Sequence, residues 1–120
     1  MISIKSVVTK AQWEDFLKLP WKIYDNDPYW VPPFLEDVKF CLDVKKNPFY
    51  KHAHREMFLA YKNGEVVGRI VGIVDKNYNV YHQTKVGWFG FLETVNDVKV
   101  ISALIEAVKE YVKNFGMEYL

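Results

Sequence analysis

The chain has 120 residues and a mass of 14.2 kDa, enough for one domain with a hydrophobic core and too little for two. Sixteen basic residues stand against fifteen acidic ones, a formal net charge of +1, so the chain lacks the basic surplus typical of proteins that bind nucleic acid or anionic membranes. A single cysteine excludes an intrachain disulfide, and no apolar run reaches the length of a membrane span. We therefore expect one globular domain, residues 1–120, in the cytoplasm, with neither nucleic acid nor membrane as a partner.

The first 24 residues predict a strand and then a helix. Isoleucines and valines in positions 2–8 indicate the strand. Thr9-Lys-Ala-Gln12 has the spacing of a capping box, which predicts a helix that begins near Lys10. Pro20 is expected to interrupt this helix, with a further turn over Trp21 to Tyr24.

A proline-rich loop and a short helix follow. Residues that precede prolines are pushed out of the helical region, so Asp27-Pro-Tyr-Trp-Val-Pro-Pro33 is expected to be an ordered, extended loop. The rigid apolar part of this loop, Tyr29 to Pro33, either packs against the sheet, the interpretation we favour, or forms a peptide-like docking motif or the rim of an acceptor pocket. A helix over Leu35 to Cys41 places the cysteine beside Phe40 and Leu42, as an inert buried thiol rather than a nucleophile.

The clearest local signal is a hairpin, because Asn63-Gly64 supplies the two positive φ angles of a tight turn. The pairs expected from a two-residue turn are Lys62 with Glu65, Ala60 with Val67, and Phe58 with Arg69. This register predicts one face with Phe58, Ala60, Val67, Val71 and Ile73, and another with Met57, Leu59, Val66, Ile70 and Val74. Because both faces are apolar, we expect helices to cover the sheet on both sides.

The last third of the chain predicts an aromatic strand, Val86 to Glu93, and a long amphipathic helix capped by Asn96-Asp97. Gly116 fits the left-handed position that ends a helix, and Met117 to Leu120 predicts four residues of a further strand. The fold is therefore expected to be incomplete at the C-terminus. A strand followed by a helix N-terminus is also where α/β proteins hold phosphorylated cofactors, so this segment is the first place to look for function.

Two other segments carry polar side chains that suggest a site. His52-Ala-His54 with His82 is open to two interpretations, a metal site or polar side chains where a loop enters the sheet, and we expect no metal because no acidic third ligand is specified. Asp75 to Lys85 is a long strand connection of the kind that often carries substrate contacts, and its ligand is not assignable.

The order of elements and several segments resemble the GNAT superfamily of N-acetyltransferases, across essentially all 120 residues. More closely, the sequence resembles an uncharacterised bacterial group of GNAT-like proteins in Pro20-Trp-Lys-Ile-Tyr24, Asp27-Pro-Tyr-Trp-Val-Pro-Pro33, Lys46-Asn-Pro-Phe-Tyr50 with His52, Val67-Gly-Arg-Ile70 and Gly87-Trp-Phe-Gly-Phe-Leu-Glu93. The resemblance implies an α/β (α+β) fold with a mixed, mostly antiparallel sheet, of which this chain is the N-terminal two-thirds. It also implies transfer of an acetyl group from acetyl-CoA to an amine of a small molecule or peptide.

In this resemblance the acetyl-CoA site lies at the end of the aromatic strand and the start of the long helix. The residues implied are Phe91 and Leu92 for the pantetheine arm, and Asn96, Asp97, Val98, Lys99, Val100 and Ile101 for the phosphates. The chain departs from the family where two small residues are usual, at Lys99 and Ile101, and Asp97 adds negative charge there. No catalytic residue is assigned, because the family's acid would follow Leu120 and its common base would fall near Lys85. We expect the 120 residues alone to be inactive.

Two further interpretations stay open. The loop without glycine is also consistent with a degenerate, non-catalytic GNAT fold that serves as a binding or assembly module. An open strand edge beside Met117 to Leu120 is also expected to recruit a second copy and form a homodimer, because unpaired edges are templates for strand addition.

Overall fold

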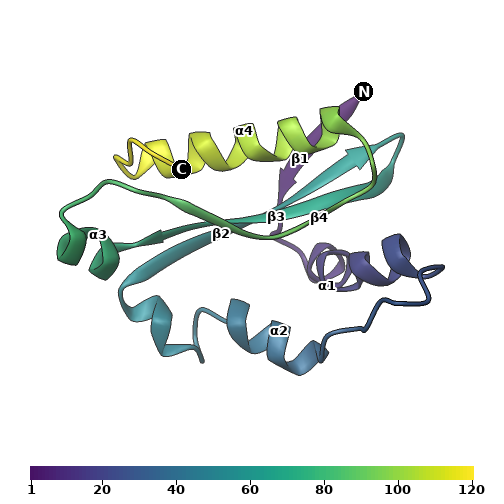
Figure 1. The fold of residues 1–120 in the computed structure, drawn as a ribbon, viewed down its shortest axis with the longest axis horizontal. Helices are drawn as coiled ribbons and strands as arrows, with labels where there is room; N and C mark the ends of the chain where they lie inside the picture. The colour runs from purple at the N-terminus through teal and green to yellow at the C-terminus, as the bar shows by residue number, and fades with distance from the viewer.

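The computed structural model describes residues 1–120, which form a four-stranded sheet with helices on both faces. The elements in order are β1 (Ile2–Ser6), α1 (Lys10–Tyr24), α2 (Leu35–Leu42), the 3-10 turn η1 (Pro48–Lys51), β2 (Ala53–Lys62), β3 (Glu65–Asp75), α3 (Lys76–His82), β4 (Trp88–Thr94) and α4 (Val98–Asn114). Every pair in the strand order β1-β2-β3-β4 is antiparallel. The sheet lies between α4 on one side and α1 with α2 on the other (Figure 1). The predicted fold class is confirmed.

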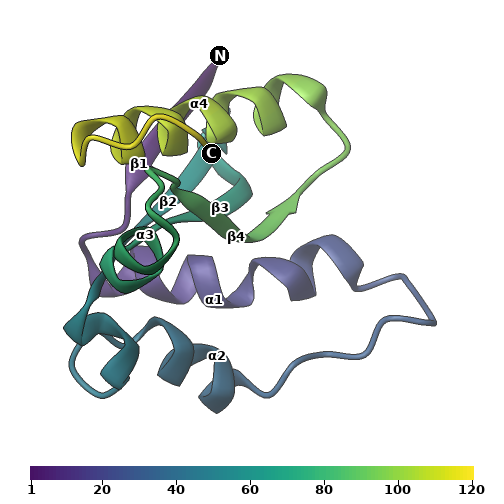
Figure 2. The same ribbon diagram turned by 60° about the vertical axis from the view of Figure 1, so that its left-hand side comes forward.

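Each face of the sheet has its own hydrophobic core. The core under α4 joins side chains of β2 and β3 to the apolar stripe of the helix, and its buried members are Phe58, Ala60, Val67, Ile70, Val74, Val100, Leu104, Val108 and Val112. The core under α1 and α2 consists of Phe16, Leu42, Met57, Leu59 and Val71. The turned view in Figure 2 shows α1 and α2 together on the face opposite α4. Both faces of the hairpin strands are therefore buried, as their sequence predicts.

The hairpin turn has the predicted geometry, with φ of 53° at Asn63 and 79° at Gly64. Lys62 pairs with Glu65, also as predicted. Asparagine and glycine take a positive φ at low cost, so the local sequence Asn63-Gly64 alone sets this turn.

The predicted register is wrong beyond the turn, because a β-bulge makes Val67 an extra residue and pairs Ala60 with Gly68. One extra residue moves every later side chain of β3 to the other face. Ile70 and Val74 therefore pack under α4, and Val71 faces α1. The bulge brings Gly68 beneath α4, where an added Cβ would lie 2.8 Å from Leu104 Cδ1. Tertiary packing against α4, which the hairpin sequence does not contain, thus favours this register.

Helix α1 begins at Lys10 with the predicted capping box. The Thr9 hydroxyl accepts a hydrogen bond from the Gln12 amide at 3.1 Å, and the Gln12 side chain accepts one from the Thr9 amide at 3.0 Å. Two amides that helix formation would leave unpaired are therefore satisfied.

The predicted break at Pro20 is wrong, because α1 continues through Pro20 to Tyr24. Proline has no amide hydrogen, so the carbonyl of Phe16, four residues earlier, lacks its helical donor. The guanidinium of Arg69 on β3 donates to that oxygen at 2.7 Å instead. A side chain 53 residues away in the sequence thus takes over a backbone hydrogen bond of the helix.

The short helix is confirmed as α2, but the burial expected for Cys41 is wrong. Leu42, at 0% exposure, takes the core position of α2, whereas Cys41 is exposed. The connection that begins at Asp75 contains a helix, α3, which no apolar periodicity announced. Asp75 caps it by accepting hydrogen bonds from the amides of Asn77 and Tyr78.

The end of α4 follows the prediction at Gly116, which has φ of 81°. The four-residue strand expected after it does not form, because only Tyr119 pairs, in an isolated parallel bridge with Val86. None of the helices combines the length and the apolarity that crossing a bilayer requires.

Candidate functional site

Strand β4 contains a bulge near its end. Its Glu93 pairs with Arg69 and its Gly90 pairs with Val71, so that two residues of β4, Phe91 and Leu92, stand opposite a single residue of β3. Phe91 has φ of 55°, a left-handed conformation that costs a residue with a side chain roughly 1–2 kcal/mol. Such a bulge re-aims the backbone of a strand and is often found next to functional sites.

Arg69 stabilises this bulge from below. Its Nε donates to the Phe91 carbonyl at 3.1 Å, and its guanidinium lies 4.8 Å from the centre of the Phe16 ring. The side chain is only 4% exposed, and burial lowers the pKa of Arg69 to about 10, which leaves it cationic at neutral pH. The guanidinium therefore joins α1 to the bulge of β4 through two backbone carbonyls.

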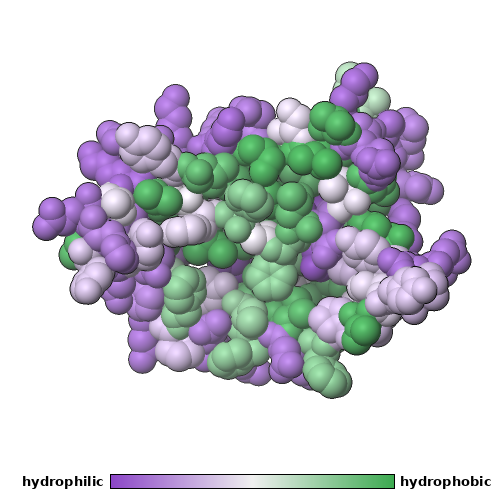
Figure 3. Space-filling model, in the orientation of Figure 1, coloured by the Kyte–Doolittle hydropathy of each residue, from purple (hydrophilic) through white to green (hydrophobic).

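The outer edge of β4 is free over most of its length. β4 ends the strand order, and on that side only the residues just before it, Lys85 to Gly87, pair with the backbone of Glu118 and Tyr119. Trp88 and Phe89 are 42% and 48% exposed there. Hydrophobic atoms gather at the centre of this side of the molecule, between α4 and the α1 and α2 layer (Figure 3). A Cβ added to Gly90 would meet nothing nearer than Ile73 Cδ1 at 4.0 Å, so the sheet face is open at this position.

The carboxylate of Glu93 lies on the α1 side of the bulge, next to aromatic side chains. Tyr24, the last residue of α1, donates its hydroxyl to Glu93 Oε2 at 2.5 Å. The pKa of Tyr24 is raised, chiefly by this hydrogen bond and then by burial. Trp30 stacks on Tyr24 with ring centres 5.6 Å apart. The pairing of Tyr24 with Glu93 is not predicted by any local pattern in the sequence, because the two residues are 69 positions apart.

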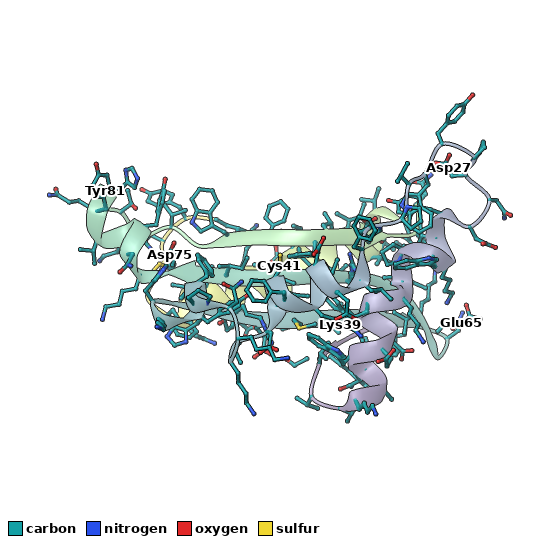
Figure 4. All side chains as sticks on the ribbon, turned by 90° about the horizontal axis from the view of Figure 1, so that it is seen from below. Asp27, Lys39, Cys41, Glu65, Asp75 and Tyr81 are labelled. Carbon is teal, nitrogen blue, oxygen red and sulfur yellow. The ribbon has the colours of Figure 1, made fainter.

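Trp30 anchors the loop between α1 and α2, and the rest of that loop projects from the body of the protein. Figure 4 shows Asp27 at the far end of the projection. Tyr29 and Val31 are 91% and 82% exposed, so the loop does not pack against the sheet as favoured above. It rests instead through Trp30 on the aromatic rings of α1, which include Trp21 at 5.4 Å.

The start of α4, the second part of the predicted site, is capped by its own carboxylate. Asp97 Oδ1 accepts from the Lys99 amide at 2.9 Å, and its backbone carbonyl accepts from the amides of Val100 and Ile101. Its Oδ2 receives Lys62 Nζ at 3.1 Å. The hydrogen bond from Lys62 is the main reason that the pKa of Asp97 is lowered, so this carboxylate is ionised at neutral pH.

The predicted site residues therefore divide into two groups with different fit to a coenzyme A donor. Phe91 and Leu92 lie at the bulge, beside the free strand edge, where the backbone is open to an extended chain. Along the turn, Asn96, Val98 and Lys99 are exposed, Ile101 is half-buried and Val100 is fully buried under α4. A pyrophosphate does not fit this turn, because the side chain of Asp97 already accepts from the Lys99 amide and its backbone carbonyl accepts from those of Val100 and Ile101.

The histidines do not form a metal site. His52 bonds to Asp75 at 2.8 Å, His54 stacks on Phe115, and His82 packs against Tyr78. No three side chains of histidine, cysteine, aspartate or glutamate come close enough together to hold a metal ion.

Two curated relatives match nearly the whole chain but are much longer than it. Protein YghO of Escherichia coli (strain K12) is 28% identical over 113 residues, 94% of this chain and 29% of the relative. The bacterial ceramide synthase of Caulobacter vibrioides is 30% identical over 116 residues, 96% of this chain and 30% of the relative. The chain thus spans less than a third of the length of these relatives. No family model matches the sequence.

Solved structures with the same fold are acetyltransferases. A GNAT-family acetyltransferase from Staphylococcus aureus Mu50 has a TM-score of 0.67 at 16% identity, covering 98% of this chain and 69% of the other. An aminoglycoside acetyltransferase from an uncultured soil metagenomic sample, in complex with sisomicin, has a TM-score of 0.64 at 14% identity, covering 98% and 74%. A tandem GNAT protein from the clavulanic acid biosynthesis pathway has a TM-score of 0.63 at 14% identity, covering 96% and 34%. The fold of this chain is therefore that of the GNAT acyltransferases.

Proposed function

We propose that this chain is the donor-binding part of an N-acyltransferase that moves an acetyl group from acetyl-CoA to an amine of a small molecule or peptide. The observation that carries the proposal is the bulge at Phe91 and Leu92, on the free edge of β4, with the Glu93 carboxylate next to it. The free edge supplies backbone groups and apolar surface, and Glu93 supplies a base.

Donor binding at this edge follows the chemistry of strand addition. The pantetheine arm carries amide groups along an extended chain, so it can pair with the backbone of β4 as a short added strand would. Such pairing depends on the backbone more than on side chains. Gly90 leaves the sheet face next to this edge open, and the exposed rings of Trp88 and Phe89 offer apolar contact to the arm.

Glu93 is the residue that we assign as general base. The nitrogen of the amine forms a bond to the thioester carbonyl carbon while the carbon–sulfur bond breaks, and the thiolate leaves with the electron pair of that bond. The amine loses one proton in this step, and Glu93 accepts it before it passes to the thiolate. Tyr24 is a positioning residue, because its hydroxyl holds the carboxylate at 2.5 Å.

The names of similar proteins support amide formation as the reaction. A ceramide is an amide of a long-chain amino alcohol, and sisomicin, bound to one structural neighbour, carries amino groups. The relatives are about three times as long as this chain, so the remaining parts of an enzyme, including a general acid, would lie elsewhere. The lack of activity expected of the 120 residues alone stays a prediction.

An amide-resolved NMR titration of the chain with S-acetyl-pantetheine tests the donor site. We expect the amide signals of Gly90, Phe91 and Leu92 to shift at millimolar ligand, whereas those of the hairpin turn at Asn63 and Gly64 do not. Unchanged signals at the bulge, in a sample whose spectrum is otherwise that of a folded protein, would remove the donor site from the proposal.

The non-catalytic module remains the second candidate, and the carboxylate of Asp97 at the start of α4 favours it. The same titration separates the two candidates, because a pure assembly module gives no response at the bulge. The homodimer through the C-terminal edge also stays a prediction, although only Tyr119 pairs there. Sedimentation velocity at high protein concentration measures it, and a strict monomer would exclude it.

A further inference from the structure

We infer that Asp97 makes the start of α4 a closed turn that rejects the pyrophosphate of coenzyme A, so that this chain recognises its donor by the pantetheine arm alone. The inference rests on the proposed function, since it concerns how the same donor is held. It extends the donor class to acyl thioesters of pantetheine that carry no nucleotide.

The hydrogen bonds of the turn carry the first step. A pyrophosphate is held at a helix start by several amides that have no other acceptor. Here five of the seven amides from residue 95 to residue 101 already have protein acceptors. They are Val95 to Val67 O, Asp97 to Val95 O, Lys99 to Asp97 Oδ1, and Val100 and Ile101 to Asp97 O. Only the amides of Asn96 and Val98 stay open, too few to cradle two phosphate groups.

Charge carries the second step. The Asp97 carboxylate occupies the place where the helix dipole favours an anion, and its other oxygen is paired with Lys62 at 3.1 Å. Lys62 is thus already neutralised, and Lys99, which is exposed, is the one cation left to attract a phosphate to this turn. A pyrophosphate that entered the turn would meet a like charge at close range, and it would have to displace a carboxylate that is covalently tethered in place.

The shape of the turn carries the third step. Close approach of a pyrophosphate to the backbone needs positions without side chains, and this segment contains no glycine between Gly90 and Gly116. Val98 points its side chain into solvent with 77% exposure, and Lys99 is exposed beside it. Side chains therefore surround the two amides that are still open.

The test compares the wild-type chain with Asp97→Ala, which removes the charge, frees the Lys99 amide and releases Lys62. Inorganic pyrophosphate is titrated while the amide signals of residues 96–101 are followed by NMR. We expect no shift in the wild type at millimolar pyrophosphate, and shifts at Val98 and Lys99 in Asp97→Ala with an affinity at least about fivefold higher. Asp43→Ala is the matched control, because Asp43 accepts hydrogen bonds from the amides of Lys45 and Lys46 on a different loop.

Each result decides the inference. Pyrophosphate shifts at residues 96–101 of the wild type would overturn it, and so would an Asp97→Ala chain that binds no better than the wild type. The bulge amides of Gly90 to Leu92 report separately on the proposed function, since pyrophosphate has no pantetheine arm. If S-acetyl-pantetheine shifts no bulge amide, the pyrophosphate titration still tests the turn at the start of α4. If the pyrophosphate result contradicts the inference, the bulge amides still test the proposed function.

Discussion

Arg69 on β3 donates a hydrogen bond at 2.7 Å to the carbonyl oxygen of Phe16, the acceptor that Pro20 leaves without a partner in α1. The same guanidinium donates to the Phe91 carbonyl in the bulge of β4. One buried cation therefore lets a helix continue through a proline and holds a strained strand residue in place. The positions of α1 and of the candidate donor edge depend on each other through this side chain.

Arg69→Met should destabilise the chain by about 2–4 kcal/mol, because two buried carbonyls lose their donors. Urea unfolding followed by circular dichroism measures the change. Arg55→Met is the matched control: Arg55 also donates two hydrogen bonds to a carbonyl, that of Leu42, but from a half-buried position, so about 1 kcal/mol is expected. Equal losses in both variants would contradict the special role of Arg69.

Pro20→Ala should raise the free energy of unfolding more in the Arg69→Met background than in the wild type. An alanine amide at position 20 can donate to the Phe16 carbonyl, so it restores the hydrogen bond that Arg69→Met removes. We expect recovery of about 1 kcal/mol in the double variant and no gain in Pro20→Ala alone. A double-mutant cycle with no coupling between the two positions would show that the Phe16 carbonyl does not need this donor.

Asn79→Ala should loosen the segment that leads into β4. Asn79 is 9% exposed; its Oδ1 accepts from the Val86 amide at 2.9 Å and its Nδ2 donates to the Val86 carbonyl at 3.0 Å. Loss of these buried partners should cost about 2–3 kcal/mol in urea unfolding. Asn77→Ala, an exposed neighbour on the same helix, should stay within about 0.5 kcal/mol of the wild type.

Gly87→Ala should be destabilising although Gly90→Ala is tolerated. A Cβ at Gly87 would lie 2.5 Å from Val112 Cγ1 and 2.6 Å from Val112 Cβ, so α4 would have to move. At Gly90 the nearest atom is 4.0 Å away. We expect a loss of about 1–3 kcal/mol at Gly87 and a much smaller one at Gly90. Thermal unfolding of the two variants side by side makes the comparison, and the reverse order would mean that α4 packs differently.

The chain should lose stability in alkaline solution in a way that depends on Tyr111. Burial between Phe58 and Phe115 raises the pKa of Tyr111 from 10.0 to about 12. The unfolded tyrosine ionises near pH 10, whereas the folded one ionises only near pH 12. The raised pKa therefore contributes stability that is fully present below pH 10 and is lost as the pH rises toward 12. The urea midpoint should therefore fall over this range, and Tyr111→Phe should fall less. Identical slopes for both chains would contradict the assignment.

Local signals predicted the elements whose causes lie within a few residues. The capping box at Thr9 and Gln12, the positive φ angles of Asn63-Gly64 and the left-handed Gly116 all act over two to four residues, so the amino-acid sequence alone located them. Apolar residues on both faces of the hairpin likewise predicted a sheet covered on both sides, because burial follows from composition and period.

The tertiary structure decided what depends on partners distant in the chain. Pro20 forbids its own hydrogen bond, but only Arg69, 49 positions later, determines that the helix continues. The register of β3 shifts at Val67 because α4 packs over Gly68, and Tyr24 meets Glu93 because α1 crosses under β4. The sequence by itself thus determined the elements that a local cap, turn or apolar period marks, and the GNAT-like segments. Packing decided the register of β3, the hydrogen bond between Tyr24 and Glu93, and which amides of the proposed donor site remain open. These features follow from contacts that no local pattern encodes.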